Sequence, residues 1–354
     1  TVKMAYTTID DPSAYFQTKI YSGDGNDDRN ITFDGNSDLA ADWLWFKRRN
    51  QSVNHILFDS TRGVTKRNHT NNTNAEATET NFLQAFQSDG FQVGTDADIN
   101  ASGGTYVAWG WKANGGTTTS SNDGDAAGYA RQTNTTAGFS IITYTGDNTG
   151  GGTVGHGLGA APEWVIAKSR AAAKPWQCYH KALGNTKSID LDNTTGANTN
   201  SASWGNTTPS STVVTLGNGD TNHTGNMIMY AWKPIQGFSK FGSYTGNGNA
   251  NGPRAYTGFK PAFLIIKNTS DGNDQWIMWD NQRSPSNPVD DYLAPSAPDA
   301  ESADSNWAII DFLSNGFKLR SSDISYNQDT HVYIYIAFAE HPFVSSEGVP
   351  TTAR

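Results

Sequence analysis

The stretch TYVAWGWK, residues Thr105–Lys112, decides the fold class because its side chains alternate with a period of two. In an extended chain, Val107, Trp109 and Trp111 fall on one face, and the residues between them fall on the other. Both faces are apolar enough to be at least half-buried, which is typical of a strand inside a sheet. The stretch therefore predicts a central strand of a β-sheet.

Nearly the same ending occurs twice more, as NMIMYAWK up to Lys233 and as VYIYIAFAE up to Glu340. The spacing of roughly a hundred residues is too long for a solenoid repeat and suits whole small domains. Each ending closes a segment that begins alike, with an alternating apolar run that reaches Tyr-Ser/Thr-Gly at residues 21–23, 144–146 and 244–246. The sequence therefore predicts three related repeats.

Each segment also contains a more continuously apolar strand that ends in a lysine. These strands are DWLWFK to Lys47, EWVIAK to Lys168 and AFLIIK to Lys267. Such runs favour strands buried on both sides, and we expect each lysine to reach solvent at the strand exit. Asp89-Gly90 and Asn315-Gly316 each precede alternating apolar residues, which is a strong hairpin signal, whereas the second segment keeps only STVVTLG.

The fold class that these patterns predict is all-β. Turn signals every 8–12 residues around short strands are typical of antiparallel sandwiches, so we expect three tandem β-sandwich domains of jelly-roll or concanavalin-like form. The predicted boundaries are 1–112, 138–234 and 235–345 for the three β-sandwich repeats, 113–137 for a Gly/Ser/Thr-rich linker and 346–354 for a C-terminal tail.

Two local predictions complete the fold. The linker is low in apolar residues, so we expect it to be exposed and flexible, whereas the second and third segments meet almost without a spacer. The best candidate for a helix is Ala75–Gln87, in which Phe82, Leu83 and Phe86 share one side.

Composition excludes several classes of function. The formal net charge is −9 and the lysines and arginines are not clustered, so we predict no binding to nucleic acid. No apolar run is long enough for a transmembrane helix, so we predict no membrane insertion. The single cysteine, Cys178, cannot form a disulfide within the chain and is expected to be a small buried apolar residue.

Aspartates and asparagines crowd the turns, which raises the question of a metal ion. Asp96, Asp98 and Asn100 alternate as in a calcium loop, but Ala101 stands at the sixth position where Gly is needed, and no Glu closes the loop at the twelfth. The seven histidines show no zinc-binding spacing. We predict no metal site and no cofactor, with calcium as the open alternative.

Carboxylates that could serve in hydrolysis are Asp59, Asp280 and Asp311. A glycosidase needs two such groups on either side of a sugar bond. Positions that recur at the same strand–turn boundary in different segments favour a structural role, and the chain contains no nucleophile-elbow motif. We therefore predict no catalytic residues and no enzymatic activity.

Several stretches together are similar to those of a known family. They are GFSKFGSYTGNG, TGFKPAFLIIKNT, WDNQRSPSNPVDDYL, IDFLSNGFKLRSSD, VYIYIAFAEHPF, DSTRGVTKRN, AEATET and SGGTYVAW. Over about Tyr15 to Phe343 the chain resembles the repeat-containing proteins of marine bacteriophages, which are described as tail-fibre-like or lectin-like. The resemblance implies a concanavalin-type sandwich and a place in the virion, and it brings no catalytic residues.

A sugar site requires an aromatic face for the ring and a few amide or carboxylate groups for the hydroxyls. Most tryptophans fall in predicted core strands, where packing explains them. Trp204 and Trp307 fall in or beside variable polar loops and are the predicted carbohydrate-binding residues.

We therefore expect a virion surface protein, a tail fibre or receptor-binding component, whose loops contact host-surface polysaccharide. The expected partners are other virion proteins and further copies of the chain in a homo-oligomer, with a trimer as one option. The alternative is a structural or decoration protein of the phage head or tail that binds no glycan. Rigid sheets that carry variable loops suit either role.

Overall fold

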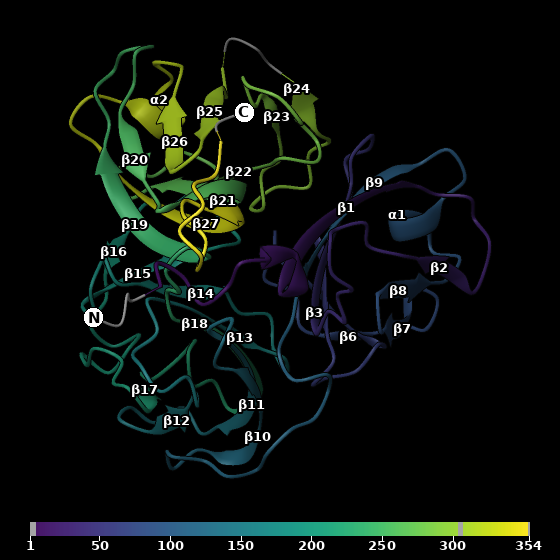
Figure 1. The fold of residues 1–354 in the computed structure, drawn as a ribbon. Coiled ribbons are helices and arrows are strands. Elements are labelled where there is room, and N and C mark those ends of the chain that lie inside the picture. The colour runs from purple at the N-terminus through teal and green to yellow at the C-terminus, as the bar shows by residue number, and fades with distance from the viewer. Residues whose placement is uncertain (1–4, 304–306, 353–354) are drawn as a thin grey trace.

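The structure is a computed structural model that describes residues 5–303 and 307–352. It is 41% strand and 3% helix, so the all-β prediction is confirmed, and its antiparallel sheets pack as β-sandwiches. Figure 1 shows three groups of strands around a common centre, purple to blue for the first segment, teal for the second, and green to yellow for the third.

One large sheet forms the body of each group. In the first, the order is β1 (Phe16–Ser22), β9 (Thr105–Trp111), β3 (Trp43–Arg48), β4 (Ile56–Asp59), β5 (Lys66–His69) and β6 (Ala77–Thr78). In the second, it is β10 (Ala127–Asn134), β11 (Phe139–Gly146), β18 (Gly225–Trp232), β13 (Trp164–Ser169), β14 (Gln177–His180), β15 (Lys187–Asp190) and β16 (Asn198–Thr199). In the third, it is β19 (Ser239–Thr245), β27 (Val332–Pro342), β21 (Phe259–Asn268) and β22 (Ile277–Asp280).

Small sheets cover the outer faces of the large ones. They are β2 (Arg29–Ile31), β8 (Gly90–Val93) and β7 (Leu83–Gln87); β12 (Thr153–Gly155) and β17 (Val213–Thr215); β20 (Arg254–Tyr256), β26 (Gly316–Leu319) and β25 (Ile310–Leu313); and β23 (Asp291–Tyr292) with β24 (Ser302–Ala303). Three single turns of helix complete the elements: η1 (Pro12–Ala14), α1 (Ala97–Asn100) and α2 (Ile324–Asn327).

The strand that the sequence singles out behaves as predicted. β9 lies between β1 and β3, and its partners include Thr18 opposite Trp109 and Trp43 opposite Trp111. In the second and third segments, β18 lies between β11 and β13, and β27 lies between β19 and β21. The closing strand of each segment is thus a central strand, paired on both sides.

The two Asn/Asp-Gly hairpins also form as predicted, but the predicted helix does not. β7 pairs with β8 at Gln87 and Gly90, and β25 pairs with β26 at Leu313 and Gly316. The range Ala75–Gln87, predicted to be a helix, contains the strands β6 and β7. A register shift between Leu83 and Ala85 gives these apolar residues the spacing that resembled a helical face.

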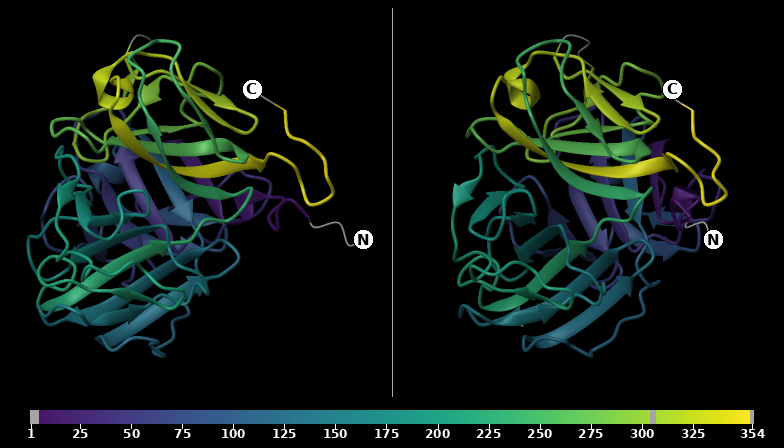
Figure 2. Two further views of the ribbon diagram at one scale, coloured as in Figure 1. Left: turned by 90° about the vertical axis from the view of Figure 1, so that its left-hand side faces the viewer. Right: turned by 60° about the vertical axis from the view of Figure 1, so that its left-hand side comes forward.

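The chain between the first two segments differs from the predicted flexible linker. Residues 127–134 form β10, which pairs along β11 from Ala127 opposite Thr145 to Asn134 opposite Phe139. The exposed part of the connection is therefore shorter than 113–137. In the views of Figure 2, the teal strands of the second segment lie below the green and yellow strands of the third, with the purple strands of the first behind them.

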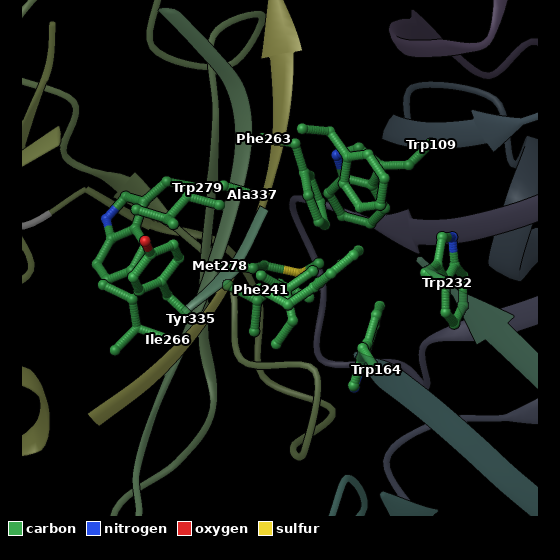
Figure 3. Close-up of a cluster of buried hydrophobic side chains, with 14 of the residues drawn as sticks. Trp109, Trp164, Trp232, Phe241, Phe263, Ile266, Met278, Trp279, Tyr335 and Ala337 are labelled. Atoms are coloured by element: carbon green, nitrogen blue, oxygen red, sulfur yellow. The ribbon is translucent and has the colours of Figure 1, made fainter. Parts of the chain in front are cut away.

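An aromatic core joins the three segments. Trp43 of the first segment lies 5.3 Å from Trp232 of the second, measured between ring centroids. Trp111 lies 5.5 Å from Phe263 of the third segment, and Trp164 of the second lies 6.1 Å from Phe241 of the third. Figure 3 shows several of these side chains pointing from different strands into one region. The segments therefore share part of their apolar interior, contrary to the expectation of three separately closed repeats.

Matched polar contacts close a ring around this core. The Glu76 amide donates to the Arg170 carbonyl (3.1 Å), the Ala197 amide to that of Thr269 (3.0 Å), and the Glu301 amide to that of Arg49 (2.8 Å). Each of these bonds joins one segment to another, so every segment gives a loop to a neighbour and receives one. Arg170 and Arg49 also form ion pairs with Glu76 and Glu301, at 2.7 and 2.6 Å.

A second set of contacts joins the end of one buried strand to the closing strand of another segment. The Tyr230 hydroxyl donates to Asp59 (2.7 Å) and the Trp109 indole to Asp280 (3.1 Å). At the corresponding place in the second segment, the imidazole of His180 donates to the Tyr335 carbonyl (3.3 Å). Burial lowers the pKa of His180 to about 4, which keeps the ring neutral near pH 7.

The three strand-end lysines do not reach solvent, so that prediction is wrong. Lys47, Lys168 and Lys267 are all fully buried, and burial lowers the pKa of each to about 8. Backbone carbonyls satisfy the ammonium groups, and for Lys168 and Lys267 one carbonyl comes from another segment, Thr73 (3.1 Å) and Thr194 (2.8 Å). Lys168 and Lys267 therefore tie loops of neighbouring segments together, whereas Lys47 donates to carbonyls of its own segment, Arg48 (2.7 Å) and Gln51 (3.0 Å).

The buried Asp59–Arg62 pair gives a direct test of the ring. Both side chains are fully buried, and Arg62 also bonds Glu76 (3.0 Å) and Tyr230 (3.2 Å). We expect Arg62→Met to lower the free energy of unfolding by about 3–5 kcal/mol, because it leaves the Asp59 carboxylate buried without its cation. Urea denaturation would measure the loss.

The matched control is Arg320→Met. Arg320 pairs with Asp311 at 3.4 Å, but its side chain is 49% exposed. We expect that variant to lose less than about 1 kcal/mol. Equal losses for the two variants would contradict a structural role for the buried pair.

Candidate functional site

The best candidate site is a groove beside β19, the edge strand of the third large sheet. We call it the tyrosine groove and define it by Tyr6, Glu163, Gln236, Lys240 and Tyr256. Its volume is about 430 Å³, which lies in the size range of small-molecule sites, roughly 300–1,000 Å³. Its walls come from the N-terminal segment, the second segment and the third segment.

Tyr256 supplies the open aromatic surface of this groove. It is the last residue of β20, and 49% of it is exposed, which is unusual for an aromatic residue in this chain. The Tyr6 hydroxyl donates to the Gly258 carbonyl (2.8 Å), so the Tyr256 hydroxyl donates to Tyr6 (3.0 Å). Burial raises the pKa of Tyr6, and its contact with Tyr256 raises it further. Two successive hydrogen bonds, from Tyr256 to Tyr6 and from Tyr6 to the Gly258 carbonyl, therefore fix the two rings.

Gly258 is required for this arrangement. Its φ is +87°, a backbone conformation that residues with a Cβ rarely adopt. A Cβ at this position would also lie 2.8 Å from the Tyr6 hydroxyl oxygen. The glycine lets the backbone approach Tyr6 closely enough to accept its hydrogen bond.

Charged and amide groups surround the exposed ring. The Lys240 ammonium lies 5.3 Å from the centroid of the Tyr256 ring and donates to the Tyr256 carbonyl at 2.9 Å. Glu163 is half-buried and pairs with Lys181 at 2.5 Å. The exposed Gln236 follows Pro234, and its carbonyl accepts from the Thr7 hydroxyl at 2.9 Å. An aromatic face beside an ammonium, a carboxylate and an amide can stack on a sugar ring and bond its hydroxyls.

The structure does not bring the two predicted sugar-binding tryptophans into this groove. Trp204 is fully buried and packs edge-on against Tyr179 with ring centroids 5.8 Å apart, so it offers no face to a sugar. The prediction for Trp204 is therefore wrong, because its polar loop folds inward over a second apolar core. Trp307 is half-buried beside Tyr292, with centroids 4.6 Å apart, and its role stays a prediction.

The stretch whose spacing resembles a calcium loop caps the helix α1. Asp96 precedes α1, and its carboxylate accepts from the Asp98 amide at 2.8 Å. Asn100 donates to the carbonyls of Asn26 (2.8 Å) and Gly94 (2.9 Å), which holds the loop onto the sheet. Within residues 5–303 and 307–352, no three His, Cys, Asp or Glu side chains gather as a metal ion would require.

The carboxylates considered for hydrolysis have structural partners. Asp59 and Asp280 are fully buried, and each pairs with an arginine three residues later. Asp311 lies on β25 and pairs with Arg320. None of the three lies in the tyrosine groove.

Sequence patterns could not find the tyrosine groove because its residues come from four separate places in the chain. Tyr256 follows Ala255 in a short alternating stretch, RAY, in which an exposed and a buried tyrosine would look the same. The only local signal is Gly258, since a glycine after a strand often marks a positive φ.

Comparisons with known proteins give a family but no function. The model of the family described as Domain of unknown function (DUF7483) matches residues 11–342. No curated protein and no solved structure matches the chain. In the part of the chain that the structure describes, no helix has the length and apolar character that a membrane crossing needs.

The placement of the tryptophans predicts how they respond to a soluble quencher. All eleven tryptophans except Trp307 are buried. We expect acrylamide to quench only a small part of the tryptophan fluorescence, and we expect Trp307→Phe to remove most of that part. Trp204→Phe is the matched control and should leave the accessible part unchanged. Loss of accessible fluorescence in Trp204→Phe instead would contradict the buried placement of Trp204.

Proposed function

We propose that this chain, which belongs to the DUF7483 family, is a non-enzymatic phage virion protein that binds a host-surface glycan in its tyrosine groove. The resemblance to marine phage proteins supports its place in the virion, as part of a tail fibre or receptor-binding component. The exposed ring of Tyr256 among ammonium, carboxylate and amide groups is the observation that carries the binding role.

We also infer that the three segments are related repeats of one sandwich, jelly-roll or concanavalin-like in form. The support is the shared order of four strands: β1-β9-β3-β4, β11-β18-β13-β14 and β19-β27-β21-β22. The recurrent contacts around the central core add to it, since each kind appears between successive pairs of segments. On this proposal the boundaries between segments are places where a single chain can present grooves with different side chains.

A glycan that binds here would stack one sugar ring on Tyr256. Lys240 and Glu163 both line the groove and carry opposite charges, so they can bond the hydroxyls of a neutral sugar or hold a zwitterionic one. Because Tyr6 already holds the Tyr256 hydroxyl, the ring would lose little freedom on binding. The groove is therefore preorganised.

A structural or decoration protein of the head or tail is the second candidate. Two large sheets end in β1 and β19, strands that pair on one side only, and such edges are suited to protein contacts. On this reading, other virion proteins or further copies of the chain in a homo-oligomer cover the grooves, and no sugar binds. A trimer is one form that such an oligomer can take.

Binding to a glycan array and to host cells tests the proposal. We expect Tyr256→Ala to weaken binding about tenfold or more. Truncating an aromatic residue at the centre of a binding site typically costs about 2 kcal/mol of binding free energy or more, and about 1.4 kcal/mol corresponds to a tenfold change in affinity. Trp307→Ala is the matched control and should bind as the unaltered chain does.

Three outcomes would decide between the candidates. Loss of binding in Trp307→Ala but not in Tyr256→Ala would move the site to the position that the sequence predicts. Absence of any glycan or cell binding, with stoichiometric incorporation around a capsid or tube, would support the structural candidate. Shortening of a polysaccharide by the purified chain would overturn the non-enzymatic assignment.

A further inference from the structure

A second groove lies at the edge of β1, between the first and third segments. Its volume is about 280 Å³. We call it the β1 groove and define it by Thr18, Asp34, Asn281, Gln282 and Glu340. What this groove can bind is indicated by the corresponding place beside β11, which another part of the chain fills.

Beside β11, the place is occupied by β10. Gln132 of β10 is fully buried, and its amide donates to the hydroxyls of Ser60 and Thr61, each at 2.7 Å. The same side chain accepts from the Gly116 amide at 2.9 Å. An added strand with one amide side chain therefore fills the boundary between the first and second segments.

Ser60 and Thr61 have counterparts in the β1 groove. They follow Asp59 at the end of β4, just as Asn281 and Gln282 follow Asp280 at the end of β22. Both amides line the β1 groove, and Gln282 is exposed. The hydroxyl pair that holds Gln132 is thus replaced by an amide pair. Asn281 is buried and donates to Glu340 at 2.7 Å, whereas the exposed Gln282 can bond a glutamine or asparagine side chain.

The backbone of β1 is ready to pair with a further strand. The Tyr15 carbonyl accepts from Lys112, and the Gly23 amide donates to Gly104, so odd-numbered residues of this stretch face β9. Hydrogen-bonded and non-hydrogen-bonded pairs alternate in an antiparallel ladder, so the amides and carbonyls of Thr18 and Ile20 point away from β9. β1 ends its sheet, and Ile20 is 38% exposed there.

β1 and β11 pair with their closing strands in the same register. Phe139 of β11 pairs with Trp232 as Phe16 of β1 pairs with Trp111, so Ile141 of β11 corresponds to Thr18. Gln132 lies opposite Ile141. A strand added to β1 in the same register would place its side chain opposite Thr18 near Asn281 and Gln282.

We propose that the β1 groove binds an extended segment of another polypeptide as an added antiparallel strand, with an amide side chain held by Gln282. The carboxylates of Asp11, Asp34 and Glu340 line the groove, so a neutral or basic segment is favoured over an acidic one. The proposal does not depend on glycan binding in the tyrosine groove.

The test uses a labelled peptide with the sequence of β10, AGYARQTN, and the full chain. We expect fluorescence anisotropy to show saturable binding that Ile20→Pro weakens about tenfold or more, because proline removes the outward N–H and crowds the added strand. Ile20→Thr keeps that N–H and is the matched control, with binding within about twofold of the unaltered chain. Binding that Ile20→Pro leaves unchanged would overturn the proposal, since the peptide would then be displacing β10 from β11.

Two further measurements keep the proposal testable if Ile20→Pro does not fold. Gln282→Leu changes an exposed side chain, and we expect it to weaken binding of AGYARQTN about threefold or more, as a lost amide contact would. A peptide in which leucine replaces the glutamine should bind the unaltered chain more weakly by the same factor. No saturable binding of AGYARQTN to the unaltered chain, or no effect of either change, would contradict the proposed groove.

Discussion

The aromatic core shared by the three large sheets is the interaction on which the rest of the structure depends. Trp43 and Trp232 from the first two segments contact each other, and Trp111 and Trp164 contact Phe263 and Phe241 of the third segment. Large aromatic rings bury the most apolar surface per residue, and pairs at these separations add a favourable edge-to-face or stacked term. The inner face of each sheet is covered by the other segments, so none of the three sheets is complete alone.

This core also explains the buried polar ring. A sheet end that meets another segment in an apolar interior must satisfy its polar groups there, because an unpaired buried group costs free energy. Asp59 and Asp280 meet Tyr230 and Trp109, and His180 meets a carbonyl. Lys168 and Lys267 do the same at the loops, where each donates to one backbone carbonyl of a neighbouring segment. Polar contacts of this kind fix the relative positions of sheets that aromatic packing alone would leave free to slide.

The core strands and both hairpins could be predicted from the sequence, because alternation and Asn/Asp-Gly turns are local signals. The strand at 83–87 could not, since a bulge gave it a helical spacing that only its pairing with β8 resolves. The burial of Lys168 and Lys267 has a related cause, because one carbonyl that accepts from each ammonium group belongs to another segment. Trp204 lies in a polar stretch, yet its loop folds onto Tyr179, a contact that no local pattern encodes. The tyrosine groove and the β1 groove arise only where segments meet.

The boundaries between segments are therefore both the source of stability and the place where ligands can enter. One boundary is filled by β10, and the other two keep grooves with different side chains. A rigid ring of sheets would hold these grooves in fixed geometry, which favours recognition without rearrangement.

The central claim is that the three sheets form one cooperative unit, and differential scanning calorimetry of the full chain tests it most directly. The shared core predicts a single unfolding transition whose calorimetric enthalpy equals its van't Hoff enthalpy. Two or three resolved transitions, each with its own enthalpy, would contradict the account, because sheets that unfold separately cannot depend on a common core.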